Sequence, residues 1–401
     1  MQLGHYGEGT AAPWYRGWSL TEEESAVFRA RSAASREAKR RAMRGEGPPP
    51  LHDINVPRLD PADLMPQLPP NGLRALSVFS GGGGFDLGFM RAGYEHLASC
   101  EILTHAGLTL KRNRSDWNVL HGHEGDVRAI DWKAWRDRVD VLHGGPPCQP
   151  FSMAGRRMGP DDTRDLFPVY VNMISTVRPV VFVAENVPAL ASGKFREYVQ
   201  NVILRPLQRG WRISMFKLSA ESVGIPQTRT RLFFVGVRRD VGRTFEPPAP
   251  AYTPMPSPYE PRPASDLLVD FVPEPPYCMG AREALGLTDI GVDGPAPTLR
   301  SGLTGPRHTT SVLSSVSALR KWNTLQIWPN GIAASREAAH AYIANNGHFR
   351  LSVDDCALLQ GFPAWWKFEG AVYMVLGQIG NSVVPPMAWQ LARSVAQLLS
   401  R

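Results

Sequence analysis

Short apolar runs alternate with longer amphipathic segments along much of the chain from residue 74 onward. Runs of this length predict buried strands, and the longer segments between them predict helices. We expect strands at residues 74–79, 97–101, 140–143, 180–184, 213–218 and 232–237. We expect helices that include residues 87–92, 166–177 and 195–208. This alternation is typical of an α/β protein with a doubly wound, mostly parallel sheet, in which ligands bind beyond the carboxyl ends of the strands.

The pattern changes on both sides of this α/β region. Residues 19–44 predict a helix with acidic residues near its start and basic residues at its end, followed by a glycine- and proline-rich linker. Residues 241–298 are rich in proline, which excludes long regular elements there. A short helix capped by Ser352 and a last helix at 384–399 are expected after that. We therefore divide the chain at residues 70, 240 and 350.

Composition places the chain among globular proteins and makes a polyanionic partner plausible. The 401 residues are 43% hydrophobic, and no apolar stretch approaches the roughly 20 residues that span a bilayer. Without a signal-peptide pattern, we expect a soluble cytoplasmic protein. The formal net charge is +7, and the basic excess lies in residues 71–240 and 299–350, which suits a face that binds nucleic acid. The four cysteines are far apart, so neither a metal site nor a disulfide framework is expected.

A glycine turn follows the first predicted strand. Gly81 to Gly84 come directly after Phe79 and Ser80 and precede a helix, so backbone amides at the helix start suit a nucleoside ligand. The run lacks the Gly-Lys-Ser/Thr of a P-loop. Glu101 ends the next strand, where a carboxylate can hold ribose hydroxyls, and Asp126 is a similar candidate for an adenine amino group. A tight loop with ordinary surface carboxylates is the alternative.

Cys148 lies in the sequence VLHGGPPCQPFS, directly after a predicted strand. The prolines fix the backbone and the glycines leave space beside it, so the thiol is held in one geometry at the ligand edge. This pattern favours a nucleophile over a buried packing cysteine.

Glu185 ends another predicted strand, where burial raises the pKa of a carboxyl group. A protonated glutamate can donate to a heterocycle nitrogen. Arg229 and Arg231 alternate at the start of the next strand and are expected to point to the same side. A loop-bracing glutamate, or an ion pair between Glu185 and an arginine, is the alternative.

Together these motifs resemble the DNA cytosine-5 methyltransferase family of bacterial restriction-modification systems. The resemblance spans about residues 74–240 and 350–401 and keeps the family order. It rests on the F-x-G-x-G-G turn (79–84), Pro-Cys-Gln (147–149), Glu-Asn-Val (185–187), Q-x-R-x-R (227–231), LLQGFP (358–363) and GNSVVPP (380–386).

The resemblance implies a role for each motif residue. Cys148 is the nucleophile that attacks carbon 6 of a flipped-out cytosine, Glu185 protonates ring nitrogen 3, Arg231 contacts the cytosine carbonyl, and Arg229 orients the loop and Glu185. The implied S-adenosylmethionine-binding residues are Phe79, Ser80, Gly81, Gly83, Gly84, Glu101, Ile102, Asp126, Val127, Pro147, Leu166, Asn381 and Ser382. Ile102 stands where many relatives carry tryptophan, so packing of the adenine is expected to be looser. The DNA-binding residues we expect are Gln149, Ser152, Arg156, Arg157, Arg300 and Arg307, and no metal is expected.

The resemblance also assigns the segments. Residues 71–240 become the catalytic, cofactor-binding domain, 241–350 the target-recognition domain, and 351–401 a return that completes the catalytic domain. For residues 1–70, a helical and proline-rich extension, the family pattern implies no role. The loop after Cys148 resembles a lid, with Gly155 and Gly159 as hinges.

We expect a monomer that methylates a specific double-stranded DNA sequence, located in the cytoplasm and at the nucleoid through DNA. It needs no membrane, and a cognate restriction endonuclease would act separately. A tRNA cytosine-5 methyltransferase and a catalytically inactive DNA-binding regulator are the alternatives. The long 241–350 insert favours DNA, and the intact Cys148, Glu185 and arginines favour an enzyme. A cysteine hydrolase would need a histidine partner, and His143 lies within a predicted strand.

Overall fold

The computed structural model describes residues 53–147, 165–255, 275–287, 292–300, 309–341 and 347–400, with scattered residues between 22 and 46. Eight residues named above lie outside the described residues: Cys148, Gln149, Ser152, Gly155, Arg156, Arg157, Gly159 and Arg307.

A seven-stranded sheet of order β3-β2-β1-β4-β5-β7-β6 forms the larger lobe. The first five strands in this order are parallel, and β7 is antiparallel to both of its neighbours. The α/β fold with a mostly parallel sheet is therefore confirmed. The strands are β1 (Arg74–Val78), β2 (Glu95–Glu101), β3 (Val119–His121), β4 (Val141–Gly144), β5 (Val181–Asn186), β6 (Trp211–Ser219) and β7 (Thr230–Arg238).

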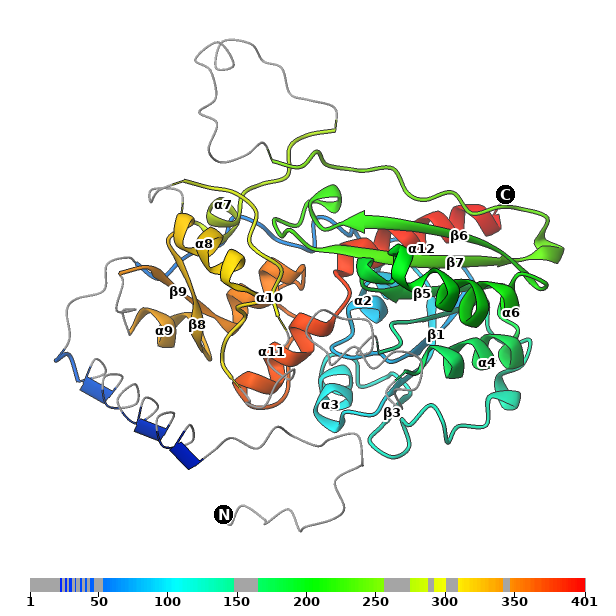
Figure 1. Ribbon diagram of the computed structural model, residues 1–401, viewed down its shortest axis with the longest axis horizontal. Coiled ribbons are helices and arrows are strands. Elements are labelled where there is room, and N and C mark those ends of the chain that lie inside the picture. The colour runs from blue at the N-terminus through cyan, green and yellow to red at the C-terminus, as the bar shows by residue number, and fades with distance from the viewer. Residues whose placement is uncertain are drawn as a thin grey trace.

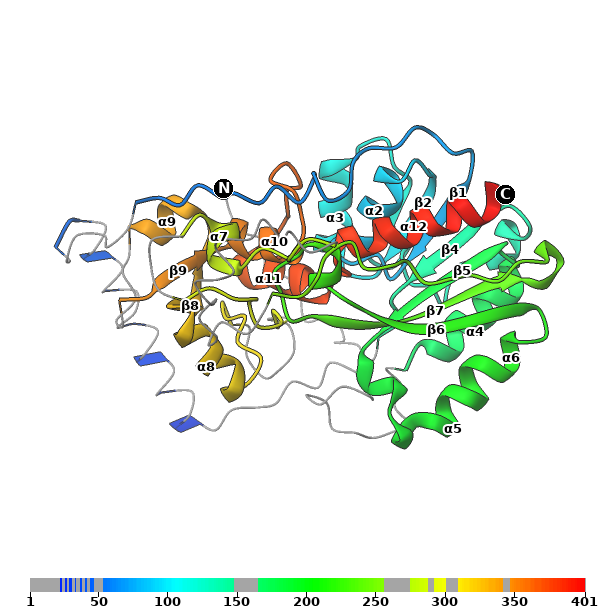
Figure 2. The same cartoon turned by 90° about the horizontal axis from the view of Figure 1, so that it is seen from above.

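Helices cover both faces of the sheet, so its central strands are buried on both sides. All six residues of β5 are buried, and Val181 and Val183 belong to one hydrophobic cluster while Phe182 and Ala184 belong to another. Figure 2 shows α2, α3 and α12 on one face, with α4, α5 and α6 on the other. Their bounds are α2 (Gly84–Arg91), α3 (Thr104–Asn113), α4 (Phe167–Val177), α5 (Arg196–Tyr198), α6 (Arg205–Leu207) and α12 (Pro385–Ser400).

One predicted helix differs in detail from the structure, and two elements of the larger lobe were not predicted. The helix expected at 195–208 contains a π-helical stretch, Val199–Leu204, between α5 and α6. Pro206 lacks an amide hydrogen, which removes one regular helical hydrogen bond at this point. Strand β3 and helix α3 were not expected. Because β3 has only three residues, its apolar run is too short to stand out.

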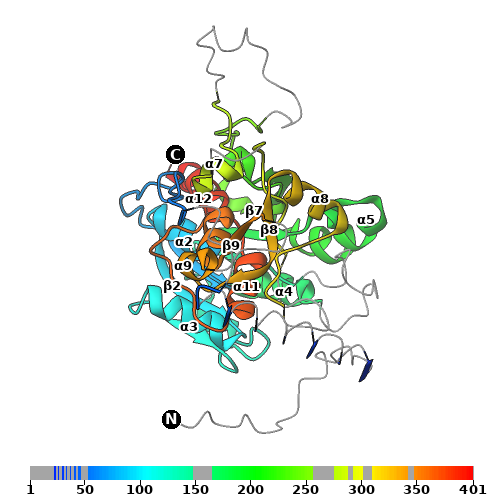
Figure 3. The same ribbon diagram turned by 90° about the vertical axis from the view of Figure 1, so that its left-hand side faces the viewer.

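A second lobe faces the carboxyl edge of the sheet and is built around the parallel pair β8 and β9. Figure 3 looks onto this lobe, with β8, β9 and the short helix α9 toward the viewer. Its elements are α7 (Ala281–Leu285), α8 (Val316–Thr324), β8 (Ile327–Ala333), α9 (Arg336–His340) and β9 (Phe349–Ser352). The sequence pattern predicted none of the elements between 299 and 350, and β9 crosses the expected boundary at residue 350.

Two helices return from this lobe to the sheet, α10 (Val353–Gln360) and α11 (Val372–Asn381). The predicted cap of α10 is present, since the Ser352 side chain accepts from the Asp355 amide and the Asp355 carboxylate accepts from the Ser352 amide. Gly361 ends the helix at a left-handed φ of 96°.

Residues 53–71 cross both lobes, and we call them the strap. In Figure 2 this segment runs along one side of the molecule, from α7 and α10 in the second lobe to α2 and α12 on the sheet. Met65 within it is fully buried in the main hydrophobic cluster. Residues 53–70 of the strap fall within the N-terminal extension expected at residues 1–70, and Met65 among them packs into the main core. Among the described residues, every helix is too short or too polar to cross a membrane.

Candidate active site

The sheet topology gathers the candidate residues at one edge. The carboxyl ends of β1, β2, β4 and β5 lead into the glycine turn, Glu101, the loop before Cys148 and Glu185. Because β7 runs antiparallel to β5, it begins at this same edge and brings Arg231 beside Glu185. This edge faces the second lobe (Figure 1). Residues far apart in the sequence therefore meet at the position where ligands bind in open α/β sheets.

Glu101 is held by backbone amides of two neighbouring loops. The amide of Gly81 donates to Oε2 and the amide of Leu103 donates to Oε1, both at 2.7 Å. Burial raises the pKa of Glu101, and these amide hydrogen bonds partly oppose the shift. The carboxylate is only 6% exposed, so it is a fixed acceptor between the first two strands of the sheet.

Gly81 is the glycine of this turn at which an added β-carbon would meet open space. A β-carbon at Gly81, where φ is 55°, would meet no atom within 4 Å. A β-carbon at Gly83 would lie 2.6 Å from Trp366, and one at Gly84 would lie 2.1 Å from the carbonyl oxygen of Val383. The turn therefore needs glycine at positions 83 and 84 because its backbone packs closely against the protein's own carboxyl-terminal segment. Gly81 lies where an added β-carbon would meet no other atom.

The other expected cofactor residues near β1 to β3 lie around Glu101 and Gly81. Phe79 has an unusual positive φ of 54°, and its ring centroid lies 6.2 Å from that of Tyr170. The Ser80 hydroxyl is buried and shares a hydrogen bond of 2.8 Å with Ser77, whereas Ile102 is 39% exposed.

Asp126 is engaged in an ion pair. Its carboxylate accepts from Nη2 of Arg128 at 2.6 Å, which lowers the pKa of Asp126. The glycine before it packs closely against Glu101, since a β-carbon at Gly125 would lie 2.3 Å from the Glu101 carbonyl oxygen. Val127 is buried, and its carbonyl accepts from the Trp132 indole at 2.8 Å. An adenine amino group at Asp126 would therefore share the carboxylate with Arg128.

Glu185 forms an ion pair at the end of β5. Nε of Arg231 lies 2.7 Å from Oε1 of Glu185, and both side chains are largely buried. Burial raises the pKa of Glu185, while Arg231 and Arg229 act in the opposite direction. From the family resemblance, Arg229 was expected to orient Glu185. In the structure, Arg231 is the arginine that contacts Glu185 directly.

The base of the loop that leads to Cys148 lies against Glu185. A β-carbon at Gly145 would be 3.0 Å from Oε2 of Glu185, so the backbone at Gly145 lies close to this carboxylate. Nδ2 of Asn186, the residue after Glu185, donates to the Pro146 carbonyl at 3.3 Å. Pro147 is half-buried and is the last described residue before Cys148.

Arg229 precedes β7 and is 1% exposed. Its Nη2 donates to the carbonyl oxygens of Gly380 and Ser382, both at 2.8 Å. Arg229 and Arg231 were expected to point to the same side as alternating strand residues, but the structure gives them different partners. Arg231 pairs with the Glu185 carboxylate, and Arg229 holds the end of α11 beside the glycine turn.

His143 does not provide a hydrolase-type base. It is fully buried in β4, and its ring stacks on Phe89 with centroids 4.3 Å apart. Burial lowers the pKa of His143 to about 3, so the ring stays neutral inside the hydrophobic layer.

Sequence comparison decides the family. Residues 73–397 match the family model described as C-5 cytosine-specific DNA methylase. The chain belongs to this family of DNA cytosine-5 methyltransferases. It is 32% identical over 328 residues to the Type II methyltransferase M.NgoMIV of Neisseria gonorrhoeae, with 82% of this chain and 98% of that protein covered. It is 30% identical to the Type II methyltransferase M.Eco47II of Escherichia coli, with 82% and 80% covered.

Solved structures share the fold. DNMT2 of Spodoptera frugiperda is 17% identical, with a TM-score of 0.51 and coverage of 82% of this chain and 100% of that one. At this identity, the likeness supports the fold of the methylase and nothing finer.

A buried chain of hydrogen bonds in this methylase was not anticipated. Nε2 of Gln227 donates to Oε1 of Gln360 at 3.1 Å, and Nε2 of Gln360 donates to the Ser382 carbonyl at 2.7 Å. Oε1 of Gln227 accepts from the amide of Leu299 at 3.2 Å. The Q-x-R-x-R segment is thereby joined both to the segment that enters the second lobe and to the end of α11. Gln227 belongs to a motif that the sequence shows, but its partners Leu299 and Gln360 lie 72 and 133 residues away along the chain.

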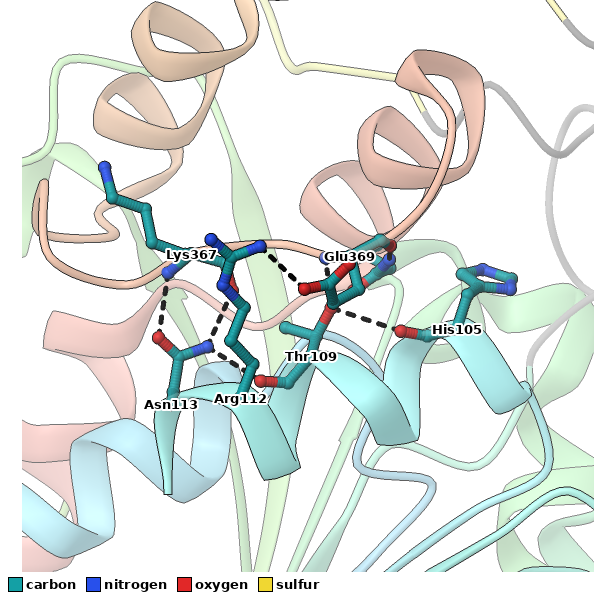
Figure 4. A network of polar contacts seen from close by, with 7 residues as sticks. His105, Thr109, Arg112, Asn113, Lys367 and Glu369 are labelled. Atoms are coloured by element: carbon teal, nitrogen blue, oxygen red, sulfur yellow. Dashed lines mark hydrogen bonds and ion pairs between the residues drawn. The ribbon is translucent and has the colours of Figure 1, made fainter. Parts of the chain in front are cut away.

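A second network clamps α11 to α3 (Figure 4). Oγ1 of Thr109 donates to Oε1 of Gln378 at 2.7 Å and accepts from the Glu369 amide at 2.8 Å. Asn113 donates to the Lys367 carbonyl and accepts from its amide. Since α3 begins just after Glu101, these contacts connect the end of β2 to the helix that ends at Asn381.

The remaining expected residues are placed as follows. Leu166 occupies the position before the first residue of α4 and is half-buried, Asn381 is exposed at the end of α11, and Arg300 is exposed on the second lobe. The Ser382 hydroxyl donates to the Gln378 carbonyl at 2.8 Å. In the part of the chain that the structure describes, no group of three or more His, Cys, Asp or Glu side chains could hold a metal.

Proposed function

We propose that this methylase transfers a methyl group from S-adenosylmethionine to carbon 5 of a flipped-out cytosine in a specific double-stranded DNA sequence. The observation that carries the proposal is the Glu185–Arg231 pair, which lies against the base of the loop that leads directly to Cys148. The Type II methyltransferases among its relatives support a role as the modification enzyme of a restriction-modification system. It would act as a monomer, with any cognate endonuclease acting separately.

The residues around Gly81 fit a nucleoside cofactor. The buried Glu101 carboxylate uses one lone pair of each oxygen on an amide and keeps the others for ribose hydroxyls. Phe79 and Ile102 offer apolar surface for the adenine, and a β-carbon at Gly81 would meet open space. When bound, S-adenosylmethionine supplies the electrophilic methyl group.

The protein's own groups prepare the cytosine. We propose that the Cys148 thiolate adds to carbon 6 while Glu185 protonates nitrogen 3, so that carbon 5 becomes nucleophilic. Once carbon 5 carries the methyl group, a base removes the proton of carbon 5. Nitrogen 3 then returns its proton to Glu185 as Cys148 leaves carbon 6 as a thiolate. The raised pKa of Glu185 supports the proton-donor role. Neither ring atom is accessible in a stacked duplex, so the base must flip out, at a cost of a few kcal/mol.

We propose that the DNA lies between the carboxyl edge of the sheet and the second lobe, which recognises the target sequence. The exposed Arg300 is a candidate contact to a base edge or a phosphate. The size of the second lobe favours DNA over tRNA, and the buried Glu185–Arg231 pair favours an enzyme over an inactive regulator.

Bisulfite sequencing of DNA from cells that express the protein tests this proposal. We expect one cytosine within a fixed sequence to be methylated, and no methylation with Cys148→Ser. The matched control is Cys278→Ser, which changes a buried cysteine of the second lobe. Methylation that persists at normal levels in Cys148→Ser would contradict the nucleophile assignment.

A duplex with 5-fluorocytosine at the target tests the covalent step. Fluorine cannot leave carbon 5 as a proton does, so we expect a stable adduct with Cys148 when S-adenosylmethionine is present. Mass spectrometry of the digested adduct identifies the attached residue. A duplex that is methylated when it carries cytosine, yet forms no adduct when it carries 5-fluorocytosine, would overturn the covalent step.

A further inference from the structure

The strap, residues 53–71, lies outside the part of the chain that matches the family, which begins at residue 73. It nevertheless makes specific contacts with both lobes. The segment that enters the second lobe at Leu299 and helix α10 also join the lobes, so the strap is a further connection, made on the side of α2 and α12.

One end of the strap is seated on the second lobe through Asn55. This side chain is 8% exposed, and its Nδ2 donates to the Leu285 carbonyl and to Oδ1 of Asp355, both at 3.0 Å. Asp355 is fully buried and also accepts from Nε of Arg336 at 2.9 Å. Asn55 thus joins the strap to α7, to the start of α10 and, through Asp355, to α9.

Backbone contacts also hold this end of the strap against the second lobe. The amides of Arg58 and Leu59 donate to the Ala284 carbonyl at 3.1 and 3.4 Å. Gly286 has a φ of 80°, and a β-carbon there would lie 2.1 Å from the Val56 carbonyl oxygen. The strap therefore lies directly on the carboxyl-terminal end of α7.

The other end of the strap is seated on the sheet lobe. Nε of Arg91 donates to the Met65 carbonyl at 2.8 Å, and the Trp389 indole donates to the Pro66 carbonyl at 3.1 Å. The amide of Leu68 donates to the Arg91 carbonyl at 2.8 Å. Helices α2 and α12, which cover the sheet, therefore hold this end of the strap.

We propose that the strap sets the position of the second lobe relative to the sheet, and that Asn55 is a positioning residue for DNA binding, acting through Asp355. This rests on the proposed function, in which DNA lies between the two lobes. The cofactor residues Glu101 and Gly81 belong to the sheet lobe alone. Loosening the strap should therefore weaken binding of DNA without weakening binding of the cofactor.

Asn55→Ala in the full chain tests this, with Gly286→Ala as a second variant that displaces the strap from the same seat. Gln67→Ala is the matched control, since the side chain of this exposed strap residue donates, within the described residues, to the carbonyls of Leu68 and Met90. We expect Asn55→Ala to raise the KM for target DNA about tenfold, the effect of losing a hydrogen bond to a charged group, and Gly286→Ala to raise the same KM by displacing the strap. The kcat at saturating DNA and the Kd for S-adenosylmethionine should stay as in the wild type.

Hydrogen exchange of single amides provides a readout that needs no DNA. We expect exchange at Arg58 and Leu59 to accelerate at least about tenfold in both test variants, while Leu68 stays protected. A merely unstable protein would instead lose kcat through a smaller folded fraction, with the KM for DNA unchanged.

Two results would overturn the proposal. One is unchanged exchange at Arg58 and Leu59, which would show that Asn55 does not hold the strap. The other is faster exchange with an unchanged KM for DNA, which would show that the strap does not position the second lobe. A wild-type protein that methylates no DNA would instead count against the proposed function.

Discussion

Glu101 and Glu185 are two buried glutamates at the same edge of the sheet, and they are held in different ways. Glu101, at the end of β2, accepts hydrogen bonds from two neutral amides at 2.7 Å. Glu185, at the end of β5, pairs with the guanidinium of Arg231 at 2.7 Å and has Arg229 nearby. Burial raises the pKa of both carboxyl groups.

The difference in partners indicates different chemistry. Amides have no charge to lose, so Glu101 is suited to a constant role as an acceptor of neutral hydroxyls. The guanidinium beside Glu185 can stabilise the carboxylate after it gives up a proton, while burial favours the protonated form before that step. We therefore expect substitutions at Glu185 to affect the chemical step and substitutions at Glu101 to affect cofactor binding.

The largest expected effect is that of Glu185→Gln. The amide oxygen can still accept from Arg231, but the side chain has no proton to transfer. We expect kcat to fall by about 10²- to 10⁴-fold, as for loss of a general acid, with the Kd for S-adenosylmethionine unchanged. Transfer of a radiolabelled methyl group and titration calorimetry measure the two quantities. A kcat close to that of the wild type would remove Glu185 from the chemical step.

A smaller effect is expected for Glu101→Gln. Because a charged acceptor becomes neutral, the Kd for S-adenosylmethionine should rise by about tenfold to a hundredfold. The kcat at saturating cofactor should change little, since Glu101 does not contact the cytosine in the proposed mechanism. Calorimetry and steady-state kinetics distinguish the two. An unchanged Kd with a strongly reduced kcat would contradict the division between the two glutamates.

The smallest effect concerns Asp86, a third buried carboxyl group that lies in α2 behind the glycine turn. It is 1% exposed and accepts from the Ser99 hydroxyl at 2.6 Å, and burial raises the pKa of Asp86 to about 6. A raised pKa in the folded state means that the protonated form stabilises the fold. This contribution is complete below the unfolded pKa of 3.8 and is lost as the pH rises through about 6.

We therefore expect Asp86→Asn, which stays neutral, to gain stability relative to the wild type between pH 5 and pH 8. The expected gain in the free energy of unfolding is on the order of 1 kcal/mol. Urea unfolding at the two pH values measures it. Asp63→Asn, which changes an exposed carboxylate, is the control and should show no such difference. A constant difference between Asp86→Asn and wild type at both pH values would show that Asp86 does not titrate in this range.

The local sequence pattern predicts much of the carboxyl edge of the sheet. An apolar run followed by a single carboxylate predicted Glu101 and Glu185 at strand ends, and five parallel strands in the doubly wound order then bring those ends together. The place of Gly145 after a strand indicated that the backbone needs space there. What it approaches, Glu185 on the neighbouring strand, is known only from the structure.

The sequence alone therefore determined the fold class, the family motifs and the residue types at the sheet edge, because these depend on periodicity and on short strings of residues. Only the tertiary structure decided which residues contact one another at this edge. Arg231 rather than Arg229 pairs with Glu185, Gly83 and Gly84 pack closely against Trp366 and Val383, and the strap joins two lobes. These contacts connect positions tens to hundreds of residues apart. Hydrophobic periodicity records which side of an element is buried, but it carries no information about which distant backbone or side chain lies there.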